Sequence, residues 1–523
     1  MKKYFSLLIF GFSIASIQAQ NTADAIRLSQ TSINGTARFQ AMSGAFGSLG
    51  GDFSAININP ASSAIFNNNQ WSVSLSDNIL KNDTNYFGTK TNSDKNSISF
   101  NQAGAVLVFE NNDKKSDWKK FSLAANYENV GNFNNDIFSS GTNQNSLANY
   151  FTSYANANNG VPKSFITTEV GETIGDLYSY LGSNLPLNSA PEVSGFQAQQ
   201  ALLGFQGFII ENAISTSTND VYVTNVRQGG NYQQQNSYST KGYNGILNFN
   251  VSGQYQDWLS VGLNLNSHFT DYRQTTIFTE KNTNANIAVD RVKSIQFKND
   301  IYTYGSGFSF QLGAIAKLQN DFRIGLAYQS PTWYELNDEL TQSVQTIQSS
   351  SAFTDDNFTT IDPKVVNVYE PYQLQSPSKI TGSLSKIFGK KGLISLDVST
   401  KNYNLVSFGP KSEDAIIEKN NDLTTSLKRT IDYRIGGEYR IKKWSLRGGY
   451  QYEESPYLIK KIMGDLYGIS TGFGYTWGDT KLDVSYAYAK RKSQQQFFDR
   501  GLTDYSTTTA INNNVTMTLV FEL

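Results

Sequence analysis

The chain ends in the segment Val515-Thr516-Met517-Thr518-Leu519-Val520-Phe521-Glu522-Leu523. Side chains of a β-strand point alternately to its two faces, so apolar residues at every second position predict a strand with one apolar face. That face carries Val515, Met517, Leu519, Phe521 and Leu523. Because a soluble edge strand shows the same pattern, the fold depends on whether the pattern recurs.

The same alternation does recur along the chain, in residues 322–328, 431–441, 444–453 and 481–488. In the third of these segments, Trp444, Leu446 and Tyr450 alternate with polar residues or glycine. Strands with one apolar and one polar face are typical of a membrane barrel, whose outside contacts lipid and whose lumen holds water. The terminal segment then reads as the closing strand of such a barrel.

Composition agrees with this interpretation. Aromatic residues make up 13% of the 523 residues and charged residues only 17%, and the net charge is -1. The net charge argues against nucleic acid as a partner. The chain has no cysteine, which excludes disulfides, zinc–thiolate sites, a cysteine nucleophile and a lipoprotein anchor.

Residues 1–19 have the pattern of a secretory signal peptide, with Lys2 and Lys3 before an apolar run from Tyr4 to Ile17 and a cleavage position near Ala19. A transmembrane anchor is the alternative, but the run is shorter than the roughly 20 residues that a spanning helix needs. No later apolar run approaches that length. If the mature chain crosses a membrane, it therefore does so as a closed barrel.

Turn spacing predicts the topology. Short breaks occur at 256–257, 319–321, 389–392, 442–443 and 478–480. They alternate with long polar connections at 78–95, 136–238, 281–296, 336–368, 405–423, 455–465 and 490–506. Short turns on one side and long loops on the other predict an all-β, transmembrane, antiparallel barrel of about 14 strands over residues 70–523, with both termini periplasmic. A soluble β-sandwich, the alternative, does not need this strict order.

Residues 20–69 do not alternate. They contain Gly35, Gly44, Gly47, Gly50 and Gly51, followed by Asn59-Pro60-Ala61. Glycine and proline of this kind favour a compact, irregular backbone, which membrane depth tolerates only inside protein or a water-filled cavity. We therefore predict a hatch, or plug, inside the barrel, with a disordered periplasmic tail as the alternative.

Motifs in collinear order then give a family resemblance. They are Gly35-Thr36-Ala37-Arg38, Gly44-Ala45, Asp52, Ala55, Asn59-Pro60-Ala61, residues 323–330, residues 376–382, Asp397-Val398, residues 434–439, residues 444–450 and Ser455-Pro456. Together they resemble the FadL/TodX family of outer-membrane transporters of hydrophobic compounds. The chain is most similar to the Bacteroidetes subgroup, whose members are often labelled hemin receptors.

The resemblance implies passive uptake of hydrophobic compounds, such as long-chain fatty acids, through capture by loops, gating by the hatch and lateral exit into lipid. The matching hatch residues are Arg38, Asp52, Asn59, Pro60 and Ala61. In the family a kink of the third strand opens the lateral exit. The third strand is expected at about 117–135, where Gly131 is the candidate kink. A simple strand-end glycine is the alternative.

The predicted extracellular insertion at 136–238 is partly helical, because apolar residues recur there at helical spacing. Phe151, Tyr154, Phe205 and Phe208 are candidates for a ligand-collecting groove, with mutual packing over the barrel mouth as the alternative. The lumen-facing charges include Arg434, Arg447 and Asp397. We expect them to form ion pairs across strands, although one arginine receiving a fatty carboxylate is a second interpretation.

Nothing in the sequence favours catalysis, a metal or a cofactor, since His268 is the only histidine and no metal-spaced cluster occurs. Hemin uptake has little support for the same reason. A TonB-dependent receptor would need a larger barrel and plug. The competing function is that of a partner barrel in the type IX secretion system. The partners expected are outer-membrane lipid and hydrophobic small molecules, with secretion-system proteins under the competing hypothesis.

Overall fold

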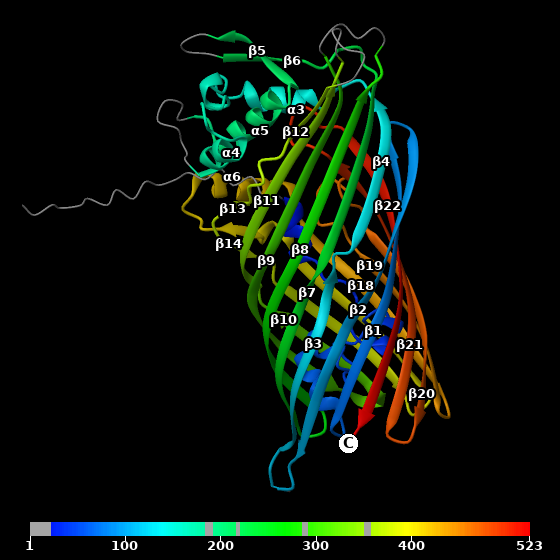
Figure 1. Ribbon diagram of the computed structural model, residues 1–523. Coiled ribbons are helices and arrows are strands. Elements are labelled where there is room, and N and C mark those ends of the chain that lie inside the picture. Colours follow the sequence, from blue (N-terminus) through cyan, green and yellow to red (C-terminus); the bar gives the residue numbers. More distant parts are fainter. Residues whose placement is uncertain (1–21, 114, 184–191, 216–219, 285–290, 350–356) are drawn as a thin grey trace, which may run out of the picture.

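The computed structural model describes residues 22–113, 115–183, 192–215, 220–284, 291–349 and 357–523. The predicted signal peptide lies outside these residues. One antiparallel sheet forms the wall (Figure 1). Its strands are β1 (Gln70–Tyr86), β2 (Thr89–Glu110), β3 (Trp118–Asn132), β4 (Asn135–Asn143), β7 (Tyr232–Tyr255), β8 (Leu259–Asn282), β9 (Val292–Lys317), β10 (Phe322–Gln329), β11 (Trp333–Gln348), β12 (Asn357–Ile361), β13 (Asn367–Val368), β14 (Tyr372–Gln375), β15 (Lys379–Phe388), β16 (Gly392–Asn402), β17 (Ser407–Gly409), β18 (Arg429–Ile441), β19 (Trp444–Glu453), β20 (Leu466–Trp477), β21 (Thr480–Gln496) and β22 (Tyr505–Glu522).

The predicted fold is confirmed as a closed, 14-stranded barrel, in which consecutive segments such as β3 with β4 and β10 with β11 together make one crossing. Closure comes from the terminal segment, because β22 pairs antiparallel with β1 from Gln70–Glu522 to Asn85–Thr507. The rings of Trp71 and Phe521 stack across this seam with centroids 4.1 Å apart. The alternating C-terminal strand therefore does close the barrel.

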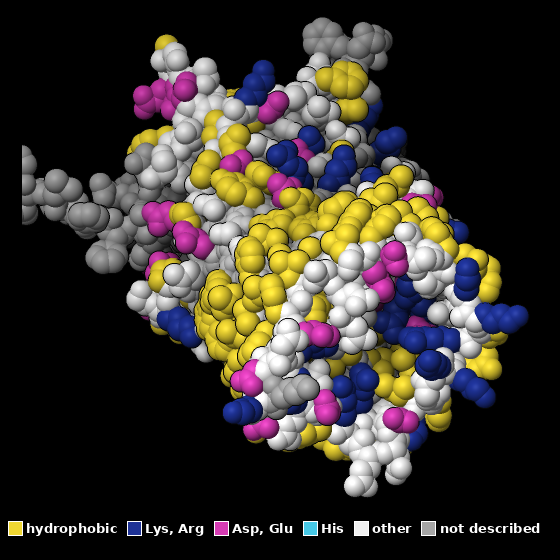
Figure 2. Space-filling model, turned by 90° about the horizontal axis from the view of Figure 1, so that it is seen from below, with side chains coloured by type: hydrophobic (Ala, Val, Ile, Leu, Met, Phe, Trp, Pro, Cys, Tyr) yellow, Lys and Arg dark blue, Asp and Glu magenta, His cyan; other side chains and the backbone are white. Residues whose placement is uncertain are grey.

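The five short breaks are tight connections between consecutive wall strands at one end of the barrel, which we call the turn end. The opposite end, called the cap end, carries the helices (Figure 1). Apolar side chains of the strands point outward around the barrel, and Figure 2 shows them on the outer wall as seen from the turn end, where Lys and Arg side chains gather. Leu326, for example, is 62% exposed, whereas its neighbour Ala327 is buried against the lumen.

The predicted polar connections are too long, because strands extend into several of them. Residues 78–95 form a β-hairpin, since β1 and β2 pair in one register from Leu75–Phe100 to Tyr86–Thr89. Strand pairing also extends into 281–296 and 336–368, and β4 and β7 occupy the two ends of the expected insertion at 136–238. Beyond the lipid both faces of a strand contact water or polar side chains. The hydrophobic alternation therefore stops there although the hydrogen-bond ladder continues.

A cap covers this end of the barrel. It contains α3 (Ala148–Ala155), η3 (Lys163–Phe165), α4 (Ile174–Ser183), α5 (Gly195–Gln206) and the hairpin of β5 (Ile210–Ser215) and β6 (Asp220–Thr224). Their buried apolar side chains share one core with the upper parts of β8, β9 and β11. A separate helix, α6 (Asp414–Ser426), lies beside β17. Among the described residues, no helix is long and apolar enough to span a membrane.

The hatch lies inside the barrel, as predicted. It comprises α1 (Thr22–Ser29), α2 (Ala37–Ala41), η1 (Ser54–Asn57) and η2 (Pro60–Ile65), and β1 follows at once. The two remaining short turns of helix, η4 (Gln319–Asp321) and η5 (Tyr403–Leu405), belong to connections of the wall. Apart from α1 and the residues just after it, nearly every hatch side chain from Asn34 to Ile65 is buried or half-buried.

Candidate functional site

Glycines on the lumen side of the strands make room for the hatch backbone. A Cβ atom added to Gly313 would lie 2.0 Å from Asn59 Oδ1, and one added to Gly325 would lie 2.2 Å from the carbonyl oxygen of Gly47. Four further strand glycines meet the hatch in the same way: Gly262, Gly436, Gly449 and Gly472. The hatch therefore packs directly against the backbone of the wall strands at these glycines.

This fit makes a first prediction. Gly325→Ala should displace the hatch, because overpacking costs about 1–3 kcal/mol and the clash is with backbone. A Ser62→Cys reporter, fully buried in the hatch of a chain without cysteine, should react with a maleimide about 10-fold faster in this variant. Gly382→Ala is the matched control, since nothing lies within 4 Å of its added Cβ. Equal labelling rates in both variants would contradict the proposed fit.

The Asn59-Pro60-Ala61 segment attaches η2 to the wall. The Asn59 side-chain amide donates to the carbonyl of Gly47 at 2.7 Å and to that of Ala314 on β9 at 3.0 Å. Its Oδ1 accepts from the Ala61 N–H at 3.1 Å, which caps η2. Asn59 thus fixes the conformation of the hatch and its height in the barrel.

Arg38 joins the hatch to a buried ion network. Its Nε donates to Glu438 Oε2 on β18 at 2.9 Å. The same oxygen accepts from Arg447 Nε at 2.7 Å, and Arg447 Nη1 donates to Asp483 Oδ1 at 2.6 Å. Glu438 also accepts from Arg440 at 2.6 Å. Side chains of Glu438 and Arg447 are fully buried, so the network holds hatch and three strands together away from water.

Two aspartates hold other parts of the hatch. Asp397 Oδ2 on β16 accepts from the backbone N–H groups of Phe46 and Gly47 at 3.0 and 2.9 Å. Asp52 lies within the hatch, where its carboxylate accepts from Thr36 Oγ1 at 2.8 Å. Burial raises the pKa of Asp52 above its ordinary value, against the opposing effects of Arg38 and of the Thr36 hydrogen bond.

Arg434, the remaining predicted lumen charge, forms an ion pair with Glu453 from β18 to β19, with nitrogen and oxygen 3.5 Å apart. The expected cross-strand pairs therefore exist, but Arg38 and Asp397 show that wall charges also bind the hatch. The position of Glu438 on the polar face of an alternating strand predicts a lumen-facing charge, and in the structure it accepts from three arginines. The sequence did not indicate that one of them belongs to the hatch.

The third crossing of the wall is broken near Gly131. Backbone pairing of β3 with β2 ends at Glu128–Gln102, and the register with β7 shifts between Asn129 and Gly131. No ladder pair joins the rest of β2 to β4 in the described chain; side chains such as Ser93, whose Oγ donates to the Asp136 carbonyl at 2.7 Å, bridge them instead. Gly131 therefore lies where the wall loses its continuous main-chain hydrogen bonds.

A small lumen cavity of about 20 Å³ lies beside this break. Its lining residues come from the hatch, from the break and from five other wall crossings: Leu28, Ser29, Thr31, Val130, Asn244, Ile246, His268, Gln329, Thr332, Tyr334, Ser376, Pro377, Lys379 and Lys401. Lys379 and Lys401 are buried, and no carboxylate lies within 4.0 Å of either ammonium in the described part of the chain. Lys401 Nζ instead donates to the Ser29 carbonyl at 3.2 Å.

The hatch also holds the broken strand directly. The Ser32 N–H donates to the Val130 carbonyl at 2.9 Å, two residues after the last β2–β3 pair. In α1, the Arg27 guanidinium lies 3.5 Å from the centroid of the Tyr272 ring. One short stretch of hatch thus lines the cavity and contacts Lys401 and the broken strand.

His268 is part of the cavity lining and its ring is already engaged. Its Nε2 lies 2.7 Å from Ser309 Oγ, and its Nδ1 lies 3.4 Å from the Tyr334 hydroxyl. Nothing in this arrangement favours hemin. Among the described residues, no group of three or more His, Cys, Asp or Glu side chains could hold a metal ion.

In the described part of the chain, the four candidate groove residues have different surroundings. Phe151 and Tyr154 are buried in the cap core, where their α3 packs on α5. Phe205 is half-buried against the same core, and Phe208 is 51% exposed at the surface. These positions favour packing for Phe151 and Tyr154 and leave Phe208 as the one accessible aromatic residue of the four.

The apolar exterior, the closed wall and the internal hatch define the class of plugged outer-membrane channels. Residues 223–519 match the family model of the outer membrane protein transport proteins (OMPP1/FadL/TodX), and the chain belongs to this family. No curated protein matches it significantly in sequence.

Solved structures agree on the fold. A Pseudomonas aeruginosa FadL homologue is similar with a TM-score of 0.51 and 11% identity, over 94% of this chain and 99% of that one. The Pseudomonas putida toluene transporter TodX is similar with a TM-score of 0.50 and 13% identity, over 95% and 99% of the two chains. At these identities the likeness concerns the fold alone.

Proposed function

We propose that this barrel carries hydrophobic compounds with an anionic head group, such as long-chain fatty acids, passively across the outer membrane. Membership of the family supports a hydrophobic-compound channel. The observation that carries the anionic head group is the buried lysine pair, Lys379 and Lys401, beside the break in β3. The turn end, which carries the C-terminus, faces the periplasm, and the cap end faces outward.

The cavity chemistry suits an amphipathic ligand. A buried ammonium without a carboxylate at contact distance is costly, and a ligand carboxylate would offset that cost through charge-assisted hydrogen bonds. Asp397 and Asp432 are the acidic groups in electrostatic range of Lys379, and neither makes an ion pair with it within 4.0 Å in the described chain. Leu28, Val130 and Ile246 provide the apolar surface for the hydrocarbon.

Access requires the hatch to move. A cavity of about 20 Å³ holds little more than one water molecule, so an acyl chain fits only after α1 and the residues that follow it shift. A carboxylate on Lys401 would compete with the Ser29 carbonyl. Binding therefore favours the shifted hatch, because the ligand interacts only with that state.

The same shift reaches the wall. Displacing Ser32 removes its hydrogen bond to Val130, which loosens the bulge around Gly131. Between β2 and β4 only side-chain bridges would then resist lateral separation. An acyl chain that leaves through this gap enters lipid directly and avoids the cost of exposing its methylenes to water, about 0.8 kcal/mol each.

The lysine pair gives the test. Lys379→Gln and Lys401→Gln should each weaken palmitate binding to the purified protein about 10-fold, since a hydrogen bond to a charged group contributes roughly 1.5–3 kcal/mol. Binding of methyl palmitate, which has no charge, should change less than 2-fold. Tritiated ligands and equilibrium dialysis measure both constants. Lys390→Gln, an exposed lysine at the turn end, is the control. Unchanged palmitate binding in both folded lumen variants would refute the proposed head-group site.

A further inference from the structure

A hollow opens on the outer wall, and it shares the buried Tyr334 side chain with the lining of the lumen cavity. Its volume is about 630 Å³, and it crosses β9, β11, β14 and β17. Its lining residues are Ser306, Gly307, Phe308, Trp333, Tyr334, Glu335, Gln373, Leu374, Gln375, Ser407, Phe408, Gly409 and Lys411. The channel proposed above makes no use of this hollow.

Local geometry explains the hollow. The connections from β10 to β11 and from β14 to β15 run side by side, and the Thr332 N–H donates to Ser376 Oγ at 2.8 Å. Beyond them β14 and α6 project sideways from the barrel below the cap (Figure 1). Gly307 and Gly409 contribute no side chain to fill the space. The hollow therefore lies between the regular barrel wall and the projecting elements β14 and α6.

One part of the hollow is aromatic and continues into the apolar band. Phe308 and Trp333 are 47% and 45% exposed, and Trp333 lies opposite Phe308 in the β9–β11 ladder. On the neighbouring strands β10 and β15, the outward-facing side chains of Leu326 and Ile380 are exposed as well. Aromatic side chains at the end of an apolar band mark the boundary between hydrocarbon and head groups.

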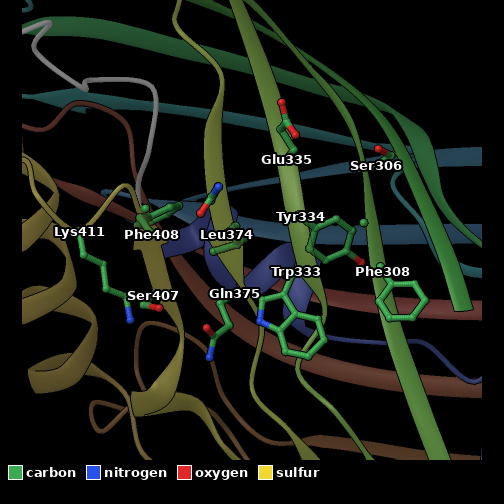
Figure 3. Close-up of a pocket in the computed structure, with 13 residues that line it drawn as sticks. Ser306, Phe308, Trp333, Tyr334, Glu335, Leu374, Gln375, Ser407, Phe408 and Lys411 are labelled. Carbon is green, nitrogen blue, oxygen red and sulfur yellow. The ribbon is translucent and has the colours of Figure 1, made fainter. Parts of the chain in front are cut away.

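The other part is polar, and its cation is Lys411. Gln375, Ser407 and Lys411 point to the same side as the Trp333 indole, whereas the Glu335 carboxylate extends away from Lys411 (Figure 3). Lys411 is exposed, and no carboxylate lies within 4.0 Å of its ammonium in the described chain. The lining therefore combines an apolar wall with one cation, Lys411, with the Glu335 carboxylate that extends away from it, and with four uncharged polar side chains.

We propose that this hollow binds a phospholipid with a net negative head group, from the membrane leaflet at the cap end, which is the outer leaflet in the orientation proposed above. Its acyl chains lie on Phe308 and Trp333, and its phosphate accepts from Lys411, Gln375 and Ser407. A soluble anion would leave the aromatic wall unused, and a neutral lipid would leave Lys411 unused. The binding is independent of the lumen lysines, so it stands or falls separately from fatty-acid uptake.

Quenching of Trp333 fluorescence provides the test. The full-length protein is reconstituted in phosphatidylcholine vesicles with increasing fractions of phosphatidylglycerol brominated on its acyl chains. The Trp333 signal is taken as the difference from Trp333→Phe, because the other five tryptophans contribute a common background. We expect half-maximal quenching of Trp333 at about 5-fold lower mole fraction than with brominated phosphatidylcholine, as one basic residue near a membrane surface contributes about that factor.

Lys411→Gln should remove this preference, and Lys461→Gln, an exposed lysine at the cap end outside the hollow, should keep it. Circular dichroism verifies that each variant is folded. Equal quenching by both lipids in the wild type, or an unchanged preference in Lys411→Gln, would overturn the proposal. Palmitate binding is measured on the same samples. Its loss with intact quenching would count against the lumen site only.

Discussion

Glu438→Gln is expected to release the hatch from the barrel wall. The substitution keeps the shape of the side chain but removes the charge that Arg38, Arg440 and Arg447 share. Breaking a buried ion pair by neutralising one partner typically costs 3–5 kcal/mol. Part of that cost falls on the hatch, because among the described residues Arg38 is the one that joins the hatch to this network.

If the hatch loses roughly 3 kcal/mol of stability, the population with the hatch open should rise about 100-fold, because each 1.4 kcal/mol changes an equilibrium constant about tenfold. Maleimide labelling of the Ser62→Cys reporter measures it, since labelling of a buried thiol follows the population of the open state. The matched control is Glu418→Gln, an exposed glutamate of α6. A labelling rate within 2-fold of the parent reporter would show that Arg38 does not hold the hatch.

Much of this site could be predicted from the alternation of side chains between the two faces of each β-strand. Arg447 and Asp397 alternate with apolar residues, so the strand geometry alone places both in the lumen. The Asn59-Pro60-Ala61 segment could likewise be assigned to the hatch, because its composition excludes a lipid-facing strand. Lys379 follows the same rule, since it precedes outward-facing Ile380; it was overlooked because one strand end gives only a short pattern.

Contacts between distant parts of the chain could not be predicted. Arg38 and Glu438 are 400 residues apart, and many inward charges on the wall were equally available to the hatch. Residues 78–95 were misassigned because their strands leave the lipid, where apolar alternation no longer reports strand pairing. For Phe151 and Tyr154 the helix was predictable but the role was not, because helical apolar spacing fits both a ligand groove and a packed core.

Locking the hatch to the wall should abolish transport if hatch displacement opens the channel. The hydroxyls of Ser48 in the hatch and Ser385 on β15 lie 2.9 Å apart. A disulfide needs about 2.05 Å between sulfurs, so Ser48→Cys/Ser385→Cys is close to bonding geometry in a chain with no other cysteine. The crosslink prevents any movement of this part of the hatch away from β15, because it replaces a hydrogen bond with a covalent bond.

We expect palmitate uptake by cells carrying the oxidised pair to fall at least 10-fold and to recover after reduction with dithiothreitol. Thr381→Cys/Ser399→Cys is the matched control, because its hydroxyls are also 2.9 Å apart and buried but both belong to the wall. Uptake should be unchanged in the oxidised control, since strands β15 and β16 are already paired throughout. Normal uptake through the oxidised hatch crosslink would mean that the ligand passes without moving this part of the hatch. Gating would then lie in the segment around Ser29 and Ser32, which contacts Lys401 and the broken strand directly.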